Sequence, residues 1–301
     1  MALQSPGTLW AWGLNNNGQL GNSTVSNPLS SPIQIGNLSN WTSISCGYNH
    51  TLALQNTGFM WAWGLNNNGQ LGQNTSTSYS SPVTTSSGPW TSINANNLNS
   101  GGIQSNGTLW TWGYNAFGQL GNNTTTIFSS PVQIGNSNTW NSIAVGNSYF
   151  GIQSNGQLYS WGLNNNGQLG ASGIVSPIQI STTSNWVALS SGFNFTLAVQ
   201  TNGSLWAWGL NSWGQLGTSN QTTYSSPVQV GSLNVWSRVA CGYSYVAAIQ
   251  SNGTLWAWGN NSFGQLGQGN NTHYSSPVQV GTISRYVTIY AMNYTTLAET
   301  V

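Results

Sequence analysis

The chain has 301 residues and only three charged side chains, Arg238, Arg285 and Glu299. One carboxylate excludes a paired acid and base, an acid-assisted catalytic triad and a carboxylate cluster for Ca²⁺ or Mg²⁺. Two cations exclude a basic surface for nucleic acid, and two histidines with two cysteines give no usual zinc spacing. We therefore expect no enzyme, no metal, no cofactor and no nucleic-acid partner.

The chain opens without the features of a signal peptide or a membrane span. Residues 1–7 carry no basic segment followed by an apolar stretch, and they run directly into repeated sequence. No run of 18 apolar residues occurs anywhere in the chain. We expect neither an ordinary secretion signal nor a membrane-spanning helix.

A phrase that joins Trp-Gly to Gly-Gln-Leu-Gly begins at Trp12 and recurs along the whole chain at spacings of 47 to 51 residues. A period near 50 residues is the size of one four-stranded propeller blade. The sequence therefore predicts an all-β fold: a single β-propeller domain of six repeats over residues 1–301, with about 50 residues in each blade. The six Trp-Gly pairs begin at Trp12, Trp63, Trp112, Trp161, Trp208 and Trp258.

Each repeat contains four short apolar runs of three to five residues, and none shows helical spacing over ten residues. Ser105-Asn106-Gly107 and its counterparts stand between two such runs, and Asn-Gly at this place predicts a two-residue hairpin turn with positive φ. Ser-Ser-Pro, as at Pro32 or Pro82, precedes the last run and suits an edge strand, which tolerates a missing N–H. We expect strands throughout and essentially no helix.

Most of the 17 Trp residues fall at fixed places in the repeat. Residues that recur once in each blade at the same place are typical of packing between blades, so these Trp residues are interpreted as structural. Trp213 is the exception, because it lies in a loop. Cys46 and Cys241 occupy equivalent places in non-adjacent repeats, which disfavours a disulfide and indicates small buried residues.

The repeat Gly-x-Leu-Trp-x-Trp-Gly-x-Asn-x-x-Gly-Gln-Leu-Gly, followed by Ser-Pro-Val-Gln, Trp-x-x-Ile-x-x-Gly and Thr-Leu-Ala-Leu-Gln, resembles the regulator of chromosome condensation repeat. The match covers nearly the whole chain. The resemblance implies a β-propeller. Members of the family usually have seven blades, whereas this sequence contains six repeats. The resemblance also implies a structural role for His50. Functions in the family range from nucleotide exchange to light sensing and enzyme inhibition, so the fold alone selects none of them.

The two ends of the chain match parts of the same repeat. Residues 2–7 align with 53–58, and residues 296–300 align with 51–55. This predicts a terminal blade shared by N- and C-terminal strands, which leaves no open edge. One strand is supplied twice, so either one copy is displaced or one end pairs with a neighbouring molecule.

Aromatic residues at variable loop positions are the candidate partner-binding site. Aromatic side chains at such places suit protein interfaces and stacking on sugars, while local covering of blade edges is the competing interpretation. The candidates are Phe117, Trp213, Phe263, Tyr79, Phe128, Tyr224 and Tyr274.

The sequence thus favours a non-catalytic binding or structural propeller with a nearly uncharged surface. We expect protein contacts or self-assembly, as a homo-oligomer or filament, and a location outside the cell, on the cell surface or on a virion. Two alternatives stay open: a carbohydrate-binding, lectin-like propeller, and a regulator or inhibitor of a partner protein. Any binding should depend little on salt, because so few ion pairs exist to be screened.

Overall fold

The computed structural model describes residues 1–85, 88–172, 175–182, 185–292 and 294–300. The chain divides into two compact units, Met1–Ser154 with Ile174–Ser176 and Asn155–Gly173 with Pro177–Val301. Across the described ranges the regular structure consists of β-strands without a helix, as the sequence predicts. Accordingly, the described residues contain no helix long and apolar enough to cross a membrane.

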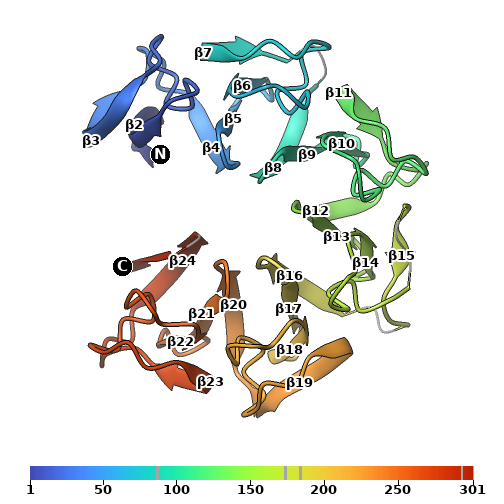
Figure 1. Ribbon diagram of the computed structural model, residues 1–301, viewed down its shortest axis with the longest axis vertical. Coiled ribbons are helices and arrows are strands. Elements are labelled where there is room, and N and C mark those ends of the chain that lie inside the picture. The colour runs from blue at the N-terminus through green and yellow to red at the C-terminus, as the bar shows by residue number, and fades with distance from the viewer. Residues whose placement is uncertain (86–87, 173–174, 183–184, 293, 301) are drawn as a thin grey trace. The chain divides into compact units, whose positions relative to one another are not determined.

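The first unit contains a three-stranded sheet, two four-stranded sheets and a hairpin, all antiparallel and with strands in chain order (Figure 1). The three-stranded sheet is β1 (Ala2–Gln4), β2 (Thr8–Asn15) and β3 (Ser26–Gln34). The four-stranded sheets are β4 (Trp41–Cys46), β5 (His50–Gln55), β6 (Met60–Gly64) and β7 (Tyr79–Thr84), and β8 (Trp90–Asn96), β9 (Asn99–Gln104), β10 (Leu109–Gly113) and β11 (Phe128–Gln133). The hairpin is β12 (Trp140–Ala144) and β13 (Ser148–Gln153).

The second unit repeats this pattern with two four-stranded sheets and two strand pairs. The pairs are β14 (Leu158–Gly162) with β15 (Ile178–Gln179), and β24 (Tyr286–Met292) with β25 (Thr295–Thr300). The sheets are β16 (Trp186–Ser191), β17 (Phe195–Gln200), β18 (Ser204–Gly209) and β19 (Tyr224–Asn234), and β20 (Trp236–Cys241), β21 (Tyr245–Gln250), β22 (Leu255–Gly259) and β23 (Tyr274–Gln279). A four-stranded antiparallel sheet in chain order is the blade of a β-propeller.

The turn between β9 and β10 differs from the two-residue turn that Asn-Gly predicts. Gly107 N donates to Gln104 O at 2.9 Å, and Gln104 N donates to Thr108 O at 3.0 Å, which leaves a loop of residues 105–107. The positive φ falls on Gly107, at 80°. A three-residue loop with a left-handed glycine matches the right-handed twist of the strands as well as a primed two-residue turn does. The hairpin itself is confirmed.

Both ends of the chain form the strand that the alignment assigns to them. β1 pairs with β2 through Ala2 and Trp10, and β25 pairs with β24 through Thr300 and Tyr286. Each copy therefore has a partner inside its own unit. The terminal blade shared by both ends, and the single domain over residues 1–301, stay predictions.

Trp side chains fill the cores where sheets pack, as their recurrence predicts. Trp63, Trp112 and Trp258 are completely buried, and each belongs to an apolar cluster that combines residues of two successive repeats. Of the cysteines, Cys241 is buried, but Cys46 is exposed, so the prediction of a buried residue is wrong for Cys46. Cys46 ends β4 as Cys241 ends β20, but Cys241 packs in an apolar cluster with residues such as Leu197 and Val246.

Candidate binding sites

The loop that links the third and fourth strands of a blade is fixed by its own side chains. In the second repeat Asn66 Oδ1 accepts a bond from Leu71 N at 2.9 Å, and Asn66 Nδ2 donates to the carbonyl oxygens of Thr75 and Thr77. Gln70 Oε1 accepts a bond from Asn68 N at 2.9 Å. The Asn and Gln of the repeated phrase thus hold the loop in one shape, from which the intervening side chain projects.

Four of the seven predicted aromatic residues lie at the start of the last strand of a blade. Each is half-buried and stands opposite a glycine of the neighbouring strand, as Tyr224 stands opposite Gly209 and Tyr274 opposite Gly259. Tyr224 and Tyr274 pack on the same apolar cluster. These contacts are the edge-covering role that competes with binding. The four residues are Tyr79, Phe128, Tyr224 and Tyr274.

The other three candidates project from the fixed loops. Phe117 and Trp213 are each 40% exposed, and Phe263 is 71% exposed. The ring of Phe117 meets Tyr114 at 6.1 Å, and that of Trp213 meets His273 edge to face at 4.7 Å. The sequence-predicted residues are therefore not gathered into one site, and only Phe263 joins a larger group of exposed aromatic rings.

That group, the aromatic cluster, consists of Phe193, Tyr243, Tyr294 and Phe263 in the second unit. Phe193 stacks on Tyr243 with ring centroids 4.4 Å apart and an angle of 19°. Tyr294 lies 5.8 Å from Tyr243 and 5.0 Å from Phe263. All four side chains are exposed. An exposed aromatic patch of this kind is typical of an interaction surface.

Backbone and side-chain bonds hold the cluster in place. Phe193 N donates to Tyr243 O at 3.2 Å, which ties two successive turns together. The hydroxyl of the buried Tyr245 donates to the carbonyl oxygen of Thr295 at 2.6 Å, directly after Tyr294. Burial raises the pKa of Tyr245 to about 12, so this hydroxyl keeps its proton at neutral pH. The rings are thus presented on a fixed framework.

Sequence reasoning missed three of the four cluster residues. Phe193 and Tyr243 follow a glycine at the same place in the repeat, as Tyr48 does in the first unit. This recurring Gly-aromatic pair was the available signal. The sequence did not show that these rings are neighbours, because each residue lies about 50 positions from the next and only the fold brings the rings together.

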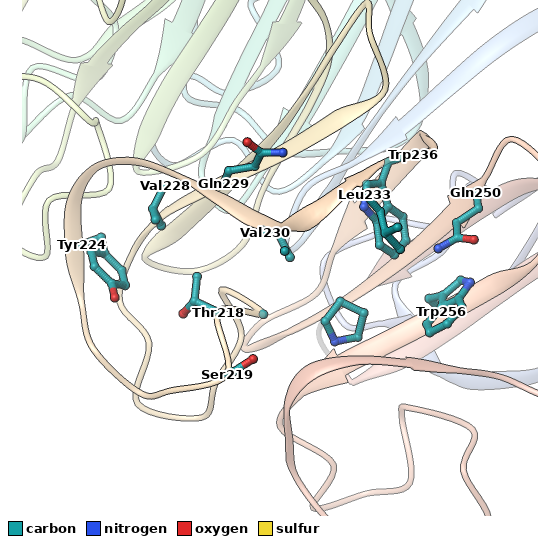
Figure 2. A pocket seen from close by; sticks show the side chains of 13 residues that line it. Thr218, Ser219, Tyr224, Val228, Gln229, Val230, Leu233, Trp236, Gln250 and Trp256 are labelled. Atoms are coloured by element: carbon teal, nitrogen blue, oxygen red, sulfur yellow. The ribbon is translucent and has the colours of Figure 1, made fainter.

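A pocket of about 380 Å³ lies beside β19 in the same unit. Figure 2 shows side chains of β19, such as Tyr224 and Gln229, on one side and Gln250 and Trp256 on the other. Trp236 also lines the pocket, and its buried Nε1 has no hydrogen-bond partner among the described residues. The lining contains no charged side chain. It therefore suits a small neutral ligand that offers hydrogen bonds.

Titratable groups do not gather at either place. Within the described ranges, no three His, Cys, Asp or Glu residues lie close enough to hold a metal ion. His50 is buried, and burial lowers its pKa to about 4 although a backbone contact from Asn99 opposes this shift. Its Nε2 lies 2.9 Å from Ser100 Oγ in the core, far from solvent.

The antiparallel four-stranded sheets and the repeated sequence define a β-propeller built from repeats, with an exposed aromatic cluster in its second unit. The model of the regulator of chromosome condensation (RCC1) repeat matches residues 6–54, 57–95, 106–151, 155–199, 202–249 and 252–298. The chain belongs to this family.

Solved structures confirm the propeller fold. Saccharomyces cerevisiae Prp20p, studied for its binding to Gsp1p and histones, has a TM-score of 0.86 and 20% identity over 99% of this chain and 80% of that one. Human WBSCR16 has a TM-score of 0.86 and 22% identity over 97% of this chain and 81% of that one. At these identities the likeness shows the fold alone. The predicted six-repeat, all-β propeller is thereby confirmed.

Curated relatives match over a short part of their length. Human protein RCC2 is 42% identical over 79 residues, which are 26% of this chain and 15% of that protein. The Arabidopsis thaliana ultraviolet-B receptor UVR8 is 41% identical over 86 residues, 27% of this chain and 19% of the receptor. The matching segments thus span less than a fifth of either relative.

The prediction of an extracellular, cell-surface or virion location is wrong. The similar Prp20p binds histones, which are chromatin proteins inside the cell. The low number of charged residues affects how the surface interacts with water and with partners, but it does not determine the cellular location of the protein. The inference from composition to compartment fails for that reason.

Proposed function

We propose that this chain is a non-catalytic module that binds and regulates a partner protein, with the aromatic cluster as its contact surface. The observation that carries the proposal is the contiguous set of exposed rings from Phe193 to Phe263 on a fixed framework. Aromatic residues dominate the energetics of protein interfaces. The yeast protein Prp20 supports it, because one of its solved structures holds it bound to Kap60 and another was studied for binding to Gsp1p and histones.

The partner surface must be neutral and partly apolar. The three charged side chains of the chain give almost no electrostatic attraction, so affinity rests on burial of apolar area. We therefore expect the dissociation constant for the partner to change less than about twofold between 0.05 and 0.5 M NaCl.

Photo-crosslinking tests the surface. A benzoylphenylalanine at position 263 should crosslink the partner, and the same probe at position 117 should not. Phe117 is the matched control, because it occupies the same loop position outside the cluster. Phe263→Ser should weaken partner binding about tenfold or more, while Phe117→Ser should leave it unchanged. Equal effects of the two variants would refute this contact surface.

A second copy of the chain meets the same chemical requirements, which keeps self-assembly within this proposal. Light scattering across concentration and salt decides between the two kinds of partner. Oligomers that persist in 1 M NaCl and vanish in Phe263→Ser identify the second copy. A constant mass of 32.0 kDa identifies a different protein as the partner.

Carbohydrate binding in the pocket beside β19 is the second candidate function. Trp256 offers a half-buried ring and Gln229 and Gln250 offer neutral amides, a combination that suits sugar hydroxyls and ring faces. A glycan array followed by Trp256→Ala tests it. Retention of every array signal in that variant would place the glycan elsewhere.

A further inference from the structure

The pocket beside β19 forms where that strand bulges out of its sheet. Gln229 is paired with Trp206 of β18. Asn234, five residues later, is paired with Ser204, which is only two residues from Trp206. The chain between Gln229 and Asn234 therefore bulges, and it supplies one wall of the pocket. In the third and sixth repeats the strands β11 and β23 end at the Gln that is equivalent to Gln229.

A buried hydrogen-bond donor at this pocket has no partner. Trp236 begins β20 and is only 5% exposed, and its Nε1 meets no acceptor within the described residues. Trp256, the second indole of the pocket, uses its own Nε1 for a 2.9 Å bond to Thr254 Oγ1. A buried N–H that has lost its bond to water is costly, so we expect the ligand of this pocket to offer an acceptor.

The unpaired N–H is a feature of the repeat, and the pocket makes it part of a site. Nε1 of Trp41 and of Trp186, at the same place in their repeats, likewise lacks a partner in the part of the chain that the structure describes. At Trp236 the bulge of β19 adds a wall. Leu233 of the bulge lies next to Trp236 in Figure 2, and both line the pocket.

The two glutamines that line the pocket offer opposite halves of their amides. Gln229 Nε2 donates to Asn234 Oδ1 at 3.4 Å, so its Oε1 stays available as an acceptor. Gln250 Oε1 accepts a 3.4 Å bond from Thr254 Oγ1, so its Nε2 stays available as a donor. A hydroxyl group both donates and accepts, so ligand hydroxyls can bond to both amides. Because all lining residues are neutral, the pocket favours a neutral ligand that carries several hydroxyls.

The two indoles present a ring and an N–H close together. The rings of Trp236 and Trp256 lie edge to face, with centroids 6.1 Å apart and an angle of 78°. The side chains of Val230 and Leu233 in the same wall carry no polar atom. A hydroxyl that accepted from Trp236 would thus leave its own proton without an acceptor from these neighbours. A carbonyl oxygen accepts without donating, so it suits this place better.

We propose that this pocket binds an N-acetylated sugar, with the acetamido carbonyl oxygen accepting a hydrogen bond from Trp236 Nε1. The acetyl methyl group then lies against Leu233, and the sugar ring packs on Trp256. Sugar hydroxyls bond to the amides of Gln229 and Gln250. The proposal deepens the second candidate function, on which it rests, by naming the class of sugar. It is independent of the aromatic cluster and of the protein partner.

Ligand-observed NMR titrations of the full chain test the acetamido group. The probes are methyl N-acetyl-β-glucosaminide and methyl β-glucoside, which differ only in the group on carbon 2. We expect a dissociation constant on the order of 1 mM for the acetylated probe and about tenfold weaker binding of the glucoside. Equal affinities would overturn the proposal and leave carbohydrate binding intact. A glycan array without any signal would refute the carbohydrate function as well.

A third probe distinguishes a sugar from an acetylated protein side chain. N-butylacetamide carries the same acetamido group on an alkyl chain, as an acetylated lysine does. It should bind about tenfold more weakly than the acetylated sugar, because it has no hydroxyls for the glutamines and no sugar ring for Trp256. Tighter binding of N-butylacetamide than of the acetylated sugar would overturn the choice of a sugar.

Two Trp variants locate the hydrogen bond. Trp236→Phe keeps an aromatic ring and removes the N–H, so it should weaken the acetylated probe about tenfold and leave the glucoside unchanged. Trp186→Phe is the matched control. Trp186 is 3% exposed, its Nε1 is also without a described partner, and it lies outside the pocket lining. The control should bind both probes as the wild type does, and equal affinity of the two variants for the acetylated probe would contradict the proposal.

An exposed position provides a variant that does not disturb the core. Leu233 is 54% exposed, and the carboxylate of Leu233→Asp can accept from Trp236 Nε1 in place of the acetyl group. This variant should weaken the acetylated probe about tenfold. Leu38→Asp, at the same place in the first repeat and 45% exposed, should have no effect. Wild-type affinity for the acetylated probe in Leu233→Asp would refute the acetyl position beside Leu233.

Discussion

The indole Nε1 of Trp63 donates a 3.0 Å hydrogen bond to the backbone carbonyl of Gln19, 44 residues earlier in the chain. The oxygen is fixed because the Gln19 side chain accepts a bond from Asn17 N and closes its own loop. One repeat therefore presents a rigid acceptor, and the next inserts a ring beneath it. Packing and hydrogen bonding between repeats are combined in a single side chain.

Replacing Trp63 tests how much this contact stabilises the fold. Trp63→Phe removes the N–H and part of a completely buried ring, which should lower the free energy of unfolding by about 1–3 kcal/mol. Trp12→Phe, at the same repeat position but exposed, should change it by less than about 0.5 kcal/mol. Urea unfolding of both variants measures the difference. Similar losses in the two variants would show that the buried hydrogen bond does not contribute to the free energy of unfolding.

Gly214 tests how closely successive repeats approach. A Cβ there would lie 2.5 Å from Ser275 Cα of the following repeat, and φ is +74°. Gly214→Ala should therefore cost about 3 kcal/mol or more, of which the backbone conformation supplies about 1 kcal/mol. Gly231→Ala is the control, because φ is +62° there and nothing lies within 4 Å of the added carbon. This variant should lose only the free energy that comes from the unfavourable backbone conformation. Thermal unfolding that ranks the two variants equally would contradict the close approach.

The fold could be predicted from the sequence because the strands and turns of each repeat are indicated by residues close together in the chain. Asn-Gly pairs marked the hairpins, and recurring Trp residues marked the packing, since neither inference needs a long-range contact. The turn type was not readable, because Ser-Asn-Gly suits a three-residue loop as well as a two-residue one, and only the pairing of Gln104 with Thr108 decides.

The binding surface was only partly readable. Phe263 was found because it replaces Asn at a loop position, but Phe193 and Tyr243 are separated by 50 residues, and their stacking depends on how successive turns align.

The two cysteines should differ in reactivity. Cys46 is exposed, whereas Cys241 is buried, and burial raises the pKa of Cys241 to about 12. At pH 8 the thiolate fraction of Cys241 is on the order of 10⁻⁴, and the sulfur is covered. Desolvation also raises the pKa of Cys46, so its thiol should react more slowly than a small free thiol. Ellman's reagent should therefore titrate one thiol in the native protein and two in urea. Cys46→Ser should abolish the native signal, and two equally fast native thiols would contradict the burial of Cys241.

Acid should destabilise the protein through His50. Its Nε2 lies 2.9 Å from Ser100 Oγ, whose own proton goes to Gln70 O at 2.7 Å, so neutral His50 is the donor of the pair. Burial lowers the pKa of His50 to about 4 in the folded chain, below the 6.5 of an unfolded histidine. The unfolded state then binds the proton first as pH falls, so stability is complete above pH 6.5 and declines toward pH 4.

The expected loss across that window is about 3 kcal/mol, with no further loss from this residue below pH 4. The chain is a clean test, because it has one carboxylate side chain and one other histidine. Urea unfolding between pH 7.5 and 3.5 measures the slope. His50→Asn should flatten it, because Asn99 already occupies the equivalent place in the next repeat and carries no titrating group. A wild-type stability that stays constant across the window would show that His50 is protonated as easily in the folded chain as in the unfolded one.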